Sequence, residues 1–187
     1  AFTPLAAAVM LAGCGINSVP TAEENAKARW ADVQASYQRR ADLIPNLVAT
    51  VRGAARAENE TLTNVINART QATQVQVSPD QLTDANRVQQ FAAAQAALSV
   101  ALRPIQEAYP QLQSQQGFQT LLSQLEGTEN RINIAVRDYN QAVQEYNTRI
   151  RTFPDAIGAR VIHGAKPLTP YQAVTPGAEQ APRVDFG

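Results

Sequence analysis

The chain is poor in the residues from which cross-links and metal sites are built. Its 187 residues include one cysteine and one histidine, which excludes a disulfide framework and a zinc site made of cysteine and histidine ligands. Its 16 basic residues balance 16 acidic ones, whereas proteins that bind nucleic acid normally carry a basic excess. The composition therefore argues against a nucleic-acid binder and against a strongly acidic tail protein.

Glycine is scarce in the middle of the chain. Between Thr21 and Phe153 it occurs at Gly53, Gly117 and Gly127, and alanine and glutamine are frequent there. Because alanine and glutamine lose little freedom on entering a helix, this stretch predicts helix. We interpret Gly53 and Gly127 as points of close packing between helices rather than as hinges.

The N-terminal residues carry a short apolar run that ends at the only cysteine. Residues 5–12 read LAAAVMLA, followed by Gly13 and Cys14. A bilayer span needs about 20 residues, so the run suits the apolar region of a secretory signal instead. The order LAGC is similar to the lipobox of bacterial lipoproteins, where cleavage precedes a cysteine that is then acylated. We therefore expect a signal peptide over residues 1–13, acylation of Cys14 and a lipidated tether over residues 14–20.

A stripe of apolar residues runs through the body of the chain. It follows a capping-box pattern at residues 21–24, which predicts a helix start. Spacings that alternate between three and four are typical of a helical bundle or coiled coil. The first part of the stripe comprises Trp30, Val33, Tyr37, Ala41, Ile44, Val48, Val51, Ala55, Leu62 and Val65. Continuity of the stripe favours one long helix over residues 21–76, whereas a turn near residues 57–60 would give four helices of comparable length.

Proline signals divide the remaining residues. The Ser-Pro pair at residues 78–79 predicts a second helix start with the serine as N-cap. Pro104 predicts a kink, and the pair Tyr109–Pro110 predicts a helix end. Ser114 can cap a last helix, which Pro154 ends. The absence of strand alternation predicts an all-α fold, and short connections favour antiparallel neighbours.

The last segment has a different composition. Prolines and glycines recur through residues 154–187 at a spacing that no helix can continue. We expect an irregular C-terminal strap there, partly lying against the helices and partly mobile. The helical bundle itself is expected over residues 21–153.

Several polar residues stand on or beside the apolar stripe. Pro45 cannot donate to the carbonyl of Ala41, so this acceptor needs another donor, for which Asn46, Asn130 and Arg131 are candidates. Glu129 occupies a position of the apolar stripe at which an apolar residue is expected. One interpretation is a polar pocket in which Glu129 acts as acid or base. We favour instead a buried structural network that sets helix register, made of Arg40, Asp42, Asn46, Glu129, Asn130 and Arg131.

Two further features concern chemistry. The pairs Tyr139-Asn140 and Tyr146-Asn147 repeat seven residues apart, which places both on one face of a helix. No histidine, nucleophile or second carboxylate is placed to pair with Glu129, and no nucleotide, metalloprotease or hydrolase motif is present. The lone His163 is interpreted as an ordinary tail residue. We therefore expect no catalytic residue, no metal ligand and no cofactor.

Several stretches resemble the LemA family of bacterial membrane-associated proteins. They are RRADLIPNLV at residues 39–48, TENRI at residues 128–132, the two Tyr-Asn pairs, and PRVDF at residues 182–186. The resemblance covers about residues 30–186. It implies an up-and-down bundle of four long, coiled-coil-like helices, with a lipobox where members usually carry a transmembrane segment. No enzymatic activity is established for the family, whose members are often encoded near membrane metalloproteases or a phosphatase-like module, and one relative helps to build the magnetosome membrane.

These observations together lead to an expected function. We expect a non-enzymatic, lipid-anchored scaffold or adaptor that is exported to the bacterial cell envelope. It would lie at the periplasmic face of the inner or outer membrane, or at the outer face of the plasma membrane. Its partner would be an envelope protein, for which a protease or a phosphatase-like module is a candidate. The alternative is a protein that organises or shapes the membrane directly, and a less favoured one is an enzyme using Glu129.

Overall fold

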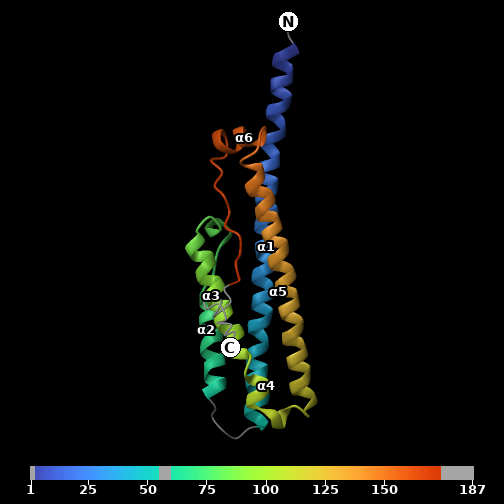
Figure 1. Cartoon of the computed structure of the whole chain (residues 1–187), viewed down its shortest axis with the longest axis vertical. Coiled ribbons are helices and arrows are strands. Elements are labelled where there is room, and N and C mark those ends of the chain that lie inside the picture. Colours follow the sequence, from blue (N-terminus) through green and yellow to red (C-terminus); the bar gives the residue numbers. More distant parts are fainter. Residues whose placement is uncertain (1–2, 55–59, 174–187) are drawn as a thin grey trace, which may run out of the picture. The chain divides into compact units, whose positions relative to one another are not determined.

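The computed structural model describes the backbone of residues 3–54 and 60–173. Side chains are described from Asn17 onward within these ranges, except those of Ala54 and Gln106. The described residues form helices and no β-strand, so the all-α prediction is confirmed. The elements are α1 (Thr3–Ala54), α2 (Glu60–Gln74), η1 (Pro79–Gln81), α3 (Ala85–Leu102), α4 (Ile105–Ala108), η2 (Pro110–Leu112), α5 (Gln116–Arg149) and α6 (Asp155–Val161) (Figure 1).

The chain divides into two compact units. Unit 1 comprises residues 1–36, 77–88 and 129–171, and unit 2 comprises residues 37–76, 89–128 and 172–187. Helices α1 and α5 each contribute to both units. No helix of the described residues has an apolar stretch long enough to cross a bilayer.

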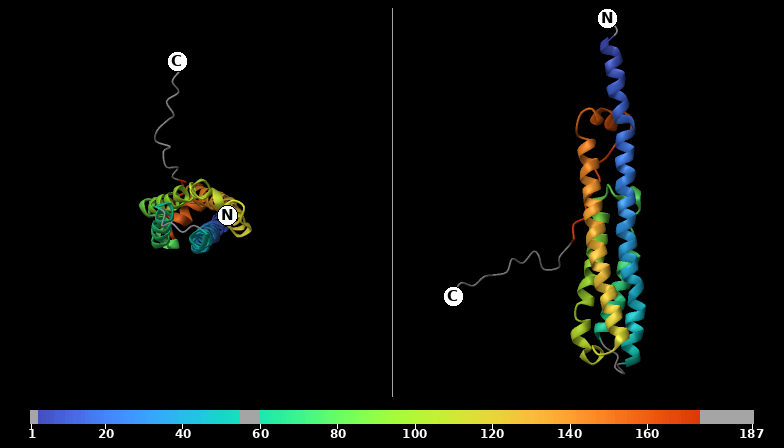
Figure 2. Two further views of the ribbon diagram at one scale, coloured as in Figure 1. Left: turned by 90° about the horizontal axis from the view of Figure 1, so that it is seen from below. Right: turned by 90° about the vertical axis from the view of Figure 1, so that its right-hand side faces the viewer.

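The core of unit 1 lies between the antiparallel helices α1 and α5 (Figure 2). The fully buried Trp30 ring packs on Tyr139, with 5.1 Å between ring centroids. Every third or fourth residue of α1 before Trp30 is also buried, so the buried face of α1 begins earlier than the predicted stripe, which starts at Trp30. The other core residues of this unit include Val19, Ala22, Ala26, Val33, Val77, Leu82, Ile132, Val143, Tyr146, Ala159, Leu168 and Tyr171.

The core of unit 2 is an apolar cluster to which α1, α2, α3, α4 and α5 contribute. Helices α1 and α2 are antiparallel, because Arg69 of α2 reaches Ala41 of α1. The chain therefore reverses after Ala54, and residues 21–76 form two helices. The predicted turn near residues 57–60 falls largely on residues 55–59, outside the described residues. The cluster comprises Ile44, Leu47, Val48, Val51, Leu62, Val65, Ala68, Ala72, Leu98, Ile105, Tyr109, Leu112 and Phe118.

The predicted helix start at residue 21 is wrong. Helix α1 runs through this position from Thr3, and the Thr21 hydroxyl donates to the carbonyl of Asn17 at 2.6 Å instead of capping a helix. Residues 14–20, for which a tether is predicted, have helical backbone. The burial of Val19 and Ala22 gives a physical reason, because packing of both sides of the Pro20 position favours a continuous helix over a new start.

The other helix ends agree only in part with the prediction. Ser78 precedes the single turn η1, and α3 starts later, where the Asp84 carboxylate accepts from the N–H groups of Asn86 and Arg87 at 3.0 and 3.3 Å. Helix α4 ends before Tyr109–Pro110, so this predicted helix end is confirmed. At Pro104 the prediction was a kink, whereas α3 ends at Leu102 and α4 begins at Ile105.

Two smaller expectations in the helices are corrected. Helix α5 begins at Gln116, so Gln115 rather than Ser114 precedes its first turn. A Cβ atom built on Gly53 or Gly127 would meet no atom of the described residues within 4 Å. The interpretation of these two glycines as close-packing points is therefore wrong.

The C-terminal segment is not irregular throughout. Residues Asp155–Val161 form α6, because the prolines at 154 and 167 leave room for a short helix between them. After α6 the chain returns along α5 without regular structure (Figures 1 and 2). We call residues 162–173 the strap. The predicted mobile part of the tail lies outside the described residues.

Candidate functional site

The two Tyr-Asn pairs of α5 hold the strap of unit 1. Tyr139 Oη donates to the carbonyl of Thr169 at 2.7 Å, and Tyr146 Oη donates to the carbonyl of Lys166 at 3.1 Å. Their seven-residue spacing puts both hydroxyls on the face of α5 along which the strap runs. Burial raises the pKa of both tyrosines above the usual value, so the hydroxyls stay protonated donors.

The two asparagines bind the strap more completely. The Asn147 side-chain amide donates to the carbonyl of Leu168 at 2.8 Å and accepts from its N–H at 2.9 Å. Asn140 makes the same pair of bonds to Tyr171, at 2.9 and 2.7 Å. Each asparagine therefore satisfies the donor and the acceptor of one backbone residue, as a neighbouring β-strand would.

The sequence of the strap suits this mode of binding. Pro167 and Pro170 have no N–H to satisfy, whereas the N–H of Thr169 donates to the carbonyl of Leu82 at 2.8 Å. All backbone N–H groups from residue 167 to 171 thus have a partner. The sequence analysis placed the Tyr-Asn pairs on one face but did not identify what they bind. They bind backbone groups, which are the same in every residue and therefore give no recognisable pattern in the strap sequence.

Trp30 connects the strap to the segment that precedes η1. Its indole N–H donates to the carbonyl of Val77 at 2.9 Å, and the Gln34 amide donates to the same oxygen at 2.9 Å. The Trp30 ring also lies 6.4 Å from that of Tyr171 in the strap. This tryptophan therefore supports two irregular segments at once.

Unit 2 contains a buried polar cluster around Arg40. The guanidinium donates to the carbonyl of Gln95 at 2.9 Å, to its Oε1 at 3.1 Å and to Ser99 Oγ at 2.6 Å. It also lies 5.0 Å from the centre of the Tyr37 ring, in cation–π geometry. The Gln95 amide in turn donates to the carbonyl of Ala72 at 3.0 Å, so α1, α2 and α3 are joined. Gln95 was recognisable only as a polar residue on the apolar stripe.

The carbonyl of Ala41 does receive a substitute donor opposite Pro45, as predicted. The donor is Arg69 Nε, at 2.9 Å, and none of the three predicted candidates. Asn46 is exposed, as is Asp42, which accepts from the Gln38 amide at 2.7 Å. The sequence could not find Arg69 because it comes from the next helix.

The predicted polar residues of α5 are not buried. Glu129, Asn130 and Arg131 are exposed, and Thr128 is the buried member of this stretch, with its hydroxyl donating to the carbonyl of Leu125 at 2.7 Å. The prediction that Glu129 lies on the buried stripe of α5 is therefore wrong by one residue. Of the six residues predicted to form a buried network, Arg40 alone is buried. A network joining all six stays a prediction, because three of them belong to unit 2 and three to unit 1.

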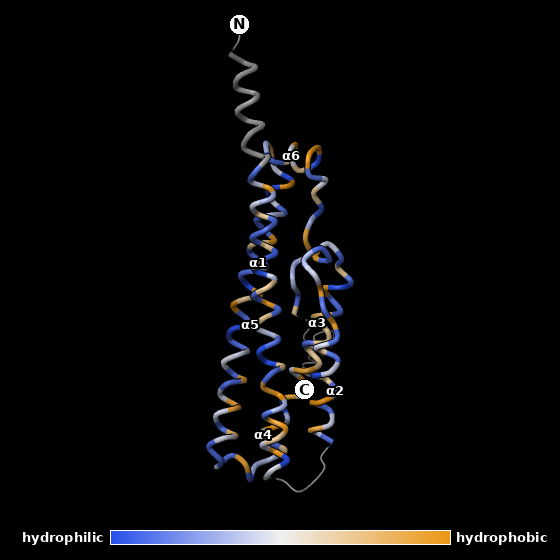
Figure 3. The backbone as a smooth tube through the Cα atoms, turned by 180° about the vertical axis from the view of Figure 1, so that it is seen from behind, coloured by the Kyte–Doolittle hydropathy of each residue, from blue (hydrophilic) through white to orange (hydrophobic). Residues whose placement is uncertain are grey.

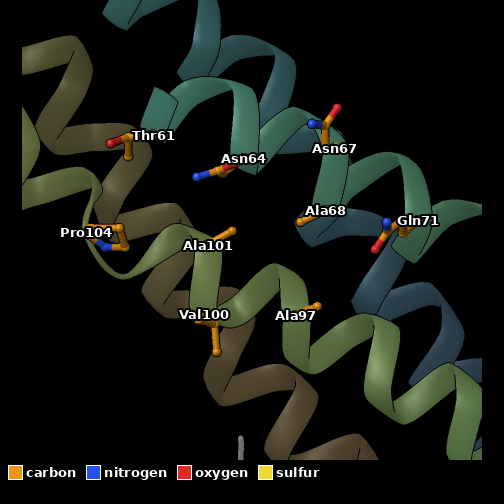
Figure 4. A pocket seen from close by; sticks show the side chains of 9 residues that line it. All are labelled: Thr61, Asn64, Asn67, Ala68, Gln71, Ala97, Val100, Ala101 and Pro104. Carbon is orange, nitrogen blue, oxygen red and sulfur yellow. The ribbon is translucent and has the colours of Figure 1, made fainter. Parts of the chain in front are cut away.

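A groove of about 430 Å³ lies between α2 and α3 of unit 2 (Figure 4). Helix α2 lines it mainly with polar side chains, and α3 lines it with alanine and valine side chains. None of the lining residues is ionisable, so the groove offers no acid–base chemistry. They are Thr61, Asn64, Asn67, Ala68, Gln71, Ala97, Val100, Ala101 and Pro104.

The remaining predictions concern the acylation site, the lone histidine and possible metal ligands. Cys14 has helical backbone in α1, and its side chain lies outside the described ones. His163 is exposed just after α6. Within the part of the chain that is described, no three histidine, cysteine, aspartate or glutamate side chains gather closely enough to hold a metal ion.

The comparisons with known proteins agree with the sequence resemblance. No curated protein matches the chain. The model of the LemA family matches residues 29–186, a range that includes the Arg40 cluster, the groove, the Tyr-Asn pairs and the strap. Since this match covers most of the chain, the protein belongs to the LemA family.

Proposed function

We propose that this LemA-family protein is a lipid-anchored, non-enzymatic helical scaffold of the bacterial cell envelope. It would be exported, acylated at Cys14 and arranged as the four-helix antiparallel bundle that the family resemblance implies. Its role would be to hold a partner protein at the membrane. An envelope protease or a phosphatase-like membrane module is a candidate partner.

The path of α1 carries this proposal. Cys14 has helical backbone, and Val19, five residues later, is already fully buried in unit 1. The same helix continues through Arg40 and Ile44 into the core of unit 2. An acyl anchor on Cys14 would therefore be joined to both units by a continuous helix. Several acyl chains on one residue suffice for stable anchoring.

The groove of unit 2 supports the partner-holding part of the proposal. Its amides on α2 can donate to and accept from a polypeptide backbone, and its alanines on α3 permit close approach of another helix. The exposed Val100 lies on its α3 side. A segment of a partner protein fits this chemistry better than a charged small molecule does, because the lining carries no charge.

The anchor is tested by replacing Cys14 with serine in the native host. We expect the unchanged protein to stay in the membrane fraction after a high-salt wash and to carry the mass of attached acyl chains. Cys14→Ser should abolish both. Equal membrane retention and unchanged mass in the two proteins would refute the anchor.

The partner is tested by gentle crosslinking in native membranes followed by mass spectrometry. We expect one envelope protein in near-equal amount, lost with Val100→Arg and retained with Gln90→Arg, an exposed position elsewhere on α3. Recovery of only lipid and further copies of the chain would contradict the scaffold role and favour direct membrane organisation.

The enzyme alternative is tested by Glu129→Gln. This change should leave partner recovery unchanged, whereas a folded variant that loses its function would favour a catalytic role for Glu129.

A further inference from the structure

Large apolar side chains that face solvent are concentrated in one short segment. Six such side chains occur among the described residues, and four of them are Phe153, Ile157, Val161 and Ile162, on α6 and at its ends. We call these four the α6 patch. Phe153 and Val161 are 72% and 79% exposed, so most of their surface faces water. Figure 3 shows hydrophobic residues within α6 and the adjoining turns, between hydrophilic ones.

Helix α6 packs on unit 1 with the face that carries its smallest side chains. Ala159 is buried at 1% exposure, whereas Ile157 and Val161, four residues apart, share a face that points to solvent. A helix on a globular protein normally buries its large apolar side chains. A contiguous apolar surface left outside is typical of a contact site.

The segment that carries the α6 patch has more basic than acidic residues, whereas the neighbouring α1 carries Glu23 and Glu24 paired with Lys27. Arg151, Arg160 and Lys166 are exposed, and the half-buried Asp155 is the one acidic residue between residues 149 and 166. The whole chain, by contrast, has no net charge. Large apolar side chains with adjacent basic residues are the composition of segments that lie on anionic lipid.

The register of α1 and α5 shows where in unit 1 this patch lies. The two helices are antiparallel and meet at Trp30 and Tyr139. Since α5 ends at Arg149, ten residues beyond Tyr139, its end reaches the level of Pro20, ten residues before Trp30. Cys14 is about 9 Å farther along α1. Figures 1 and 2 both show α6 beside α1 at this end of unit 1.

We propose that the α6 patch inserts into the interfacial region of the bilayer, with Arg151, Arg160 and Lys166 facing anionic headgroups. This inference deepens the proposed function and rests on its anchor for the position of the membrane. An acyl group on Cys14 holds the patch close to lipid at high effective concentration. Weak insertion of α6 therefore suffices to fix how the anchored end of unit 1 faces the membrane.

The test uses the exported form, residues 14–187, with Cys14→Ser, so that neither an acyl group nor the apolar run of residues 5–12 contributes. It is mixed with vesicles of phosphatidylcholine and phosphatidylglycerol in equal parts, and with phosphatidylcholine vesicles. We expect binding to the anionic vesicles that the added double change Ile157→Gln and Val161→Gln lowers about tenfold or more. The matched control Ile134→Gln removes an exposed apolar side chain of unit 1 outside the patch and should change binding less than about twofold.

A second measurement reports insertion directly. Phe153→Trp and Ile134→Trp each add one indole to the same Cys14→Ser background, where the buried Trp30 is common to both. Lipids brominated in their acyl chains should quench the added fluorescence at position 153 and leave that at position 134 unchanged. Circular dichroism verifies that the helical content of all variants is equal.

Other results would overturn the inference. They are an absence of binding to anionic vesicles, equal binding by the double variant, or equal quenching at both positions. Sedimentation distinguishes another occupant, since a dimer that the double variant dissociates, with unchanged vesicle binding, would assign the patch to a second copy of the chain. If Cys14 is not acylated in the native host but the vesicles are bound, only the anchor is refuted. If Cys14 is acylated but the vesicles are not bound, only the inserted patch is refuted.

Discussion

In unit 1 a long helix binds the backbone of an irregular segment, whereas in unit 2 three helices bind one another through buried side chains. The strap is held by two asparagines and two tyrosines that contact its carbonyl and N–H groups. In unit 2 the Arg40 guanidinium and the Gln95 amide join α1, α2 and α3 inside an otherwise apolar core.

The two arrangements differ in what they require of the sequence. Binding to backbone depends on the residues of α5 and on prolines that remove unneeded N–H groups, so these hydrogen bonds do not depend on the strap side chains, of which Leu168 and Tyr171 are separately buried in the core. Binding between buried side chains depends on both partners, because loss of one leaves the other unsatisfied in a low-dielectric interior. Substitutions that separate these cases are described below in order of expected effect.

The largest effect is expected at the tryptophan of unit 1. Trp30→Ala removes a fully buried ring and should lower the free energy of unfolding by about 4 kcal/mol. Trp30→Phe keeps most of the volume and loses the bond to Val77, and should cost about half as much. Urea unfolding measures both values. Equal losses would mean that the ring volume is not what stabilises this unit.

The next effect is expected at the buried arginine of unit 2. Arg40→Ala should lower the free energy of unfolding by about 3 kcal/mol, because it leaves Gln95 and Ser99 without their donor. Arg40→Lys should recover only part of the lost free energy, since one ammonium group cannot replace the several fixed N–H donors of the guanidinium. The exposed Arg39→Ala is the control and should stay within about 0.5 kcal/mol. A neutral Arg40→Ala would contradict the role given to the cluster.

A smaller effect is expected for the asparagines that bind the strap. Asn147→Ala removes both bonds to Leu168 and should cost about 2 kcal/mol. Hydrogen exchange at the Leu168 amide should accelerate before that of α5 itself. Asn130→Ala, an exposed asparagine on the same helix, should change neither quantity. Unchanged exchange at Leu168 in the Asn147 variant would show that the strap is held by other means.

The smallest effect compares one tyrosine from each unit. Tyr139→Phe should cost about 1 kcal/mol, because the carbonyl of Thr169 loses its donor. Tyr109 in unit 2 has a buried hydroxyl with no hydrogen-bond partner among the described residues, so Tyr109→Phe should be neutral or slightly stabilising. Chemical unfolding of the two variants gives the difference. Equal losses would contradict this contrast between the units.

The predictions that succeeded depend on local chemistry. The helical stripe around Trp30 and Ile44 and the helix end before Tyr109 follow from side-chain spacing and from the restriction that proline places on the residue before it. The need for a substitute donor at Ala41 follows from the missing N–H of Pro45. These properties belong to a few neighbouring residues, so a sequence shows them without a three-dimensional model.

The predictions that failed depend on distant residues. No helix starts at residue 21, because the packing around Val19 favours a continuous helix there. Glu129 is exposed, because the buried face of α5 is shifted by one residue from the predicted one. A short helix fitted between prolines in the tail. Each outcome was decided by which elements pack together, which local propensity does not encode.

By itself the sequence determined the all-α class, the family and most breaks between helices. The tertiary structure alone decided that Arg69 serves the carbonyl of Ala41, that Gln95 binds Arg40 and that the Tyr-Asn pairs hold the strap. It also decided that α6 leaves its large apolar side chains outside. The physical reason is that periodicity and proline act within one segment, whereas the partner of a buried donor is set by the segment that folds against it.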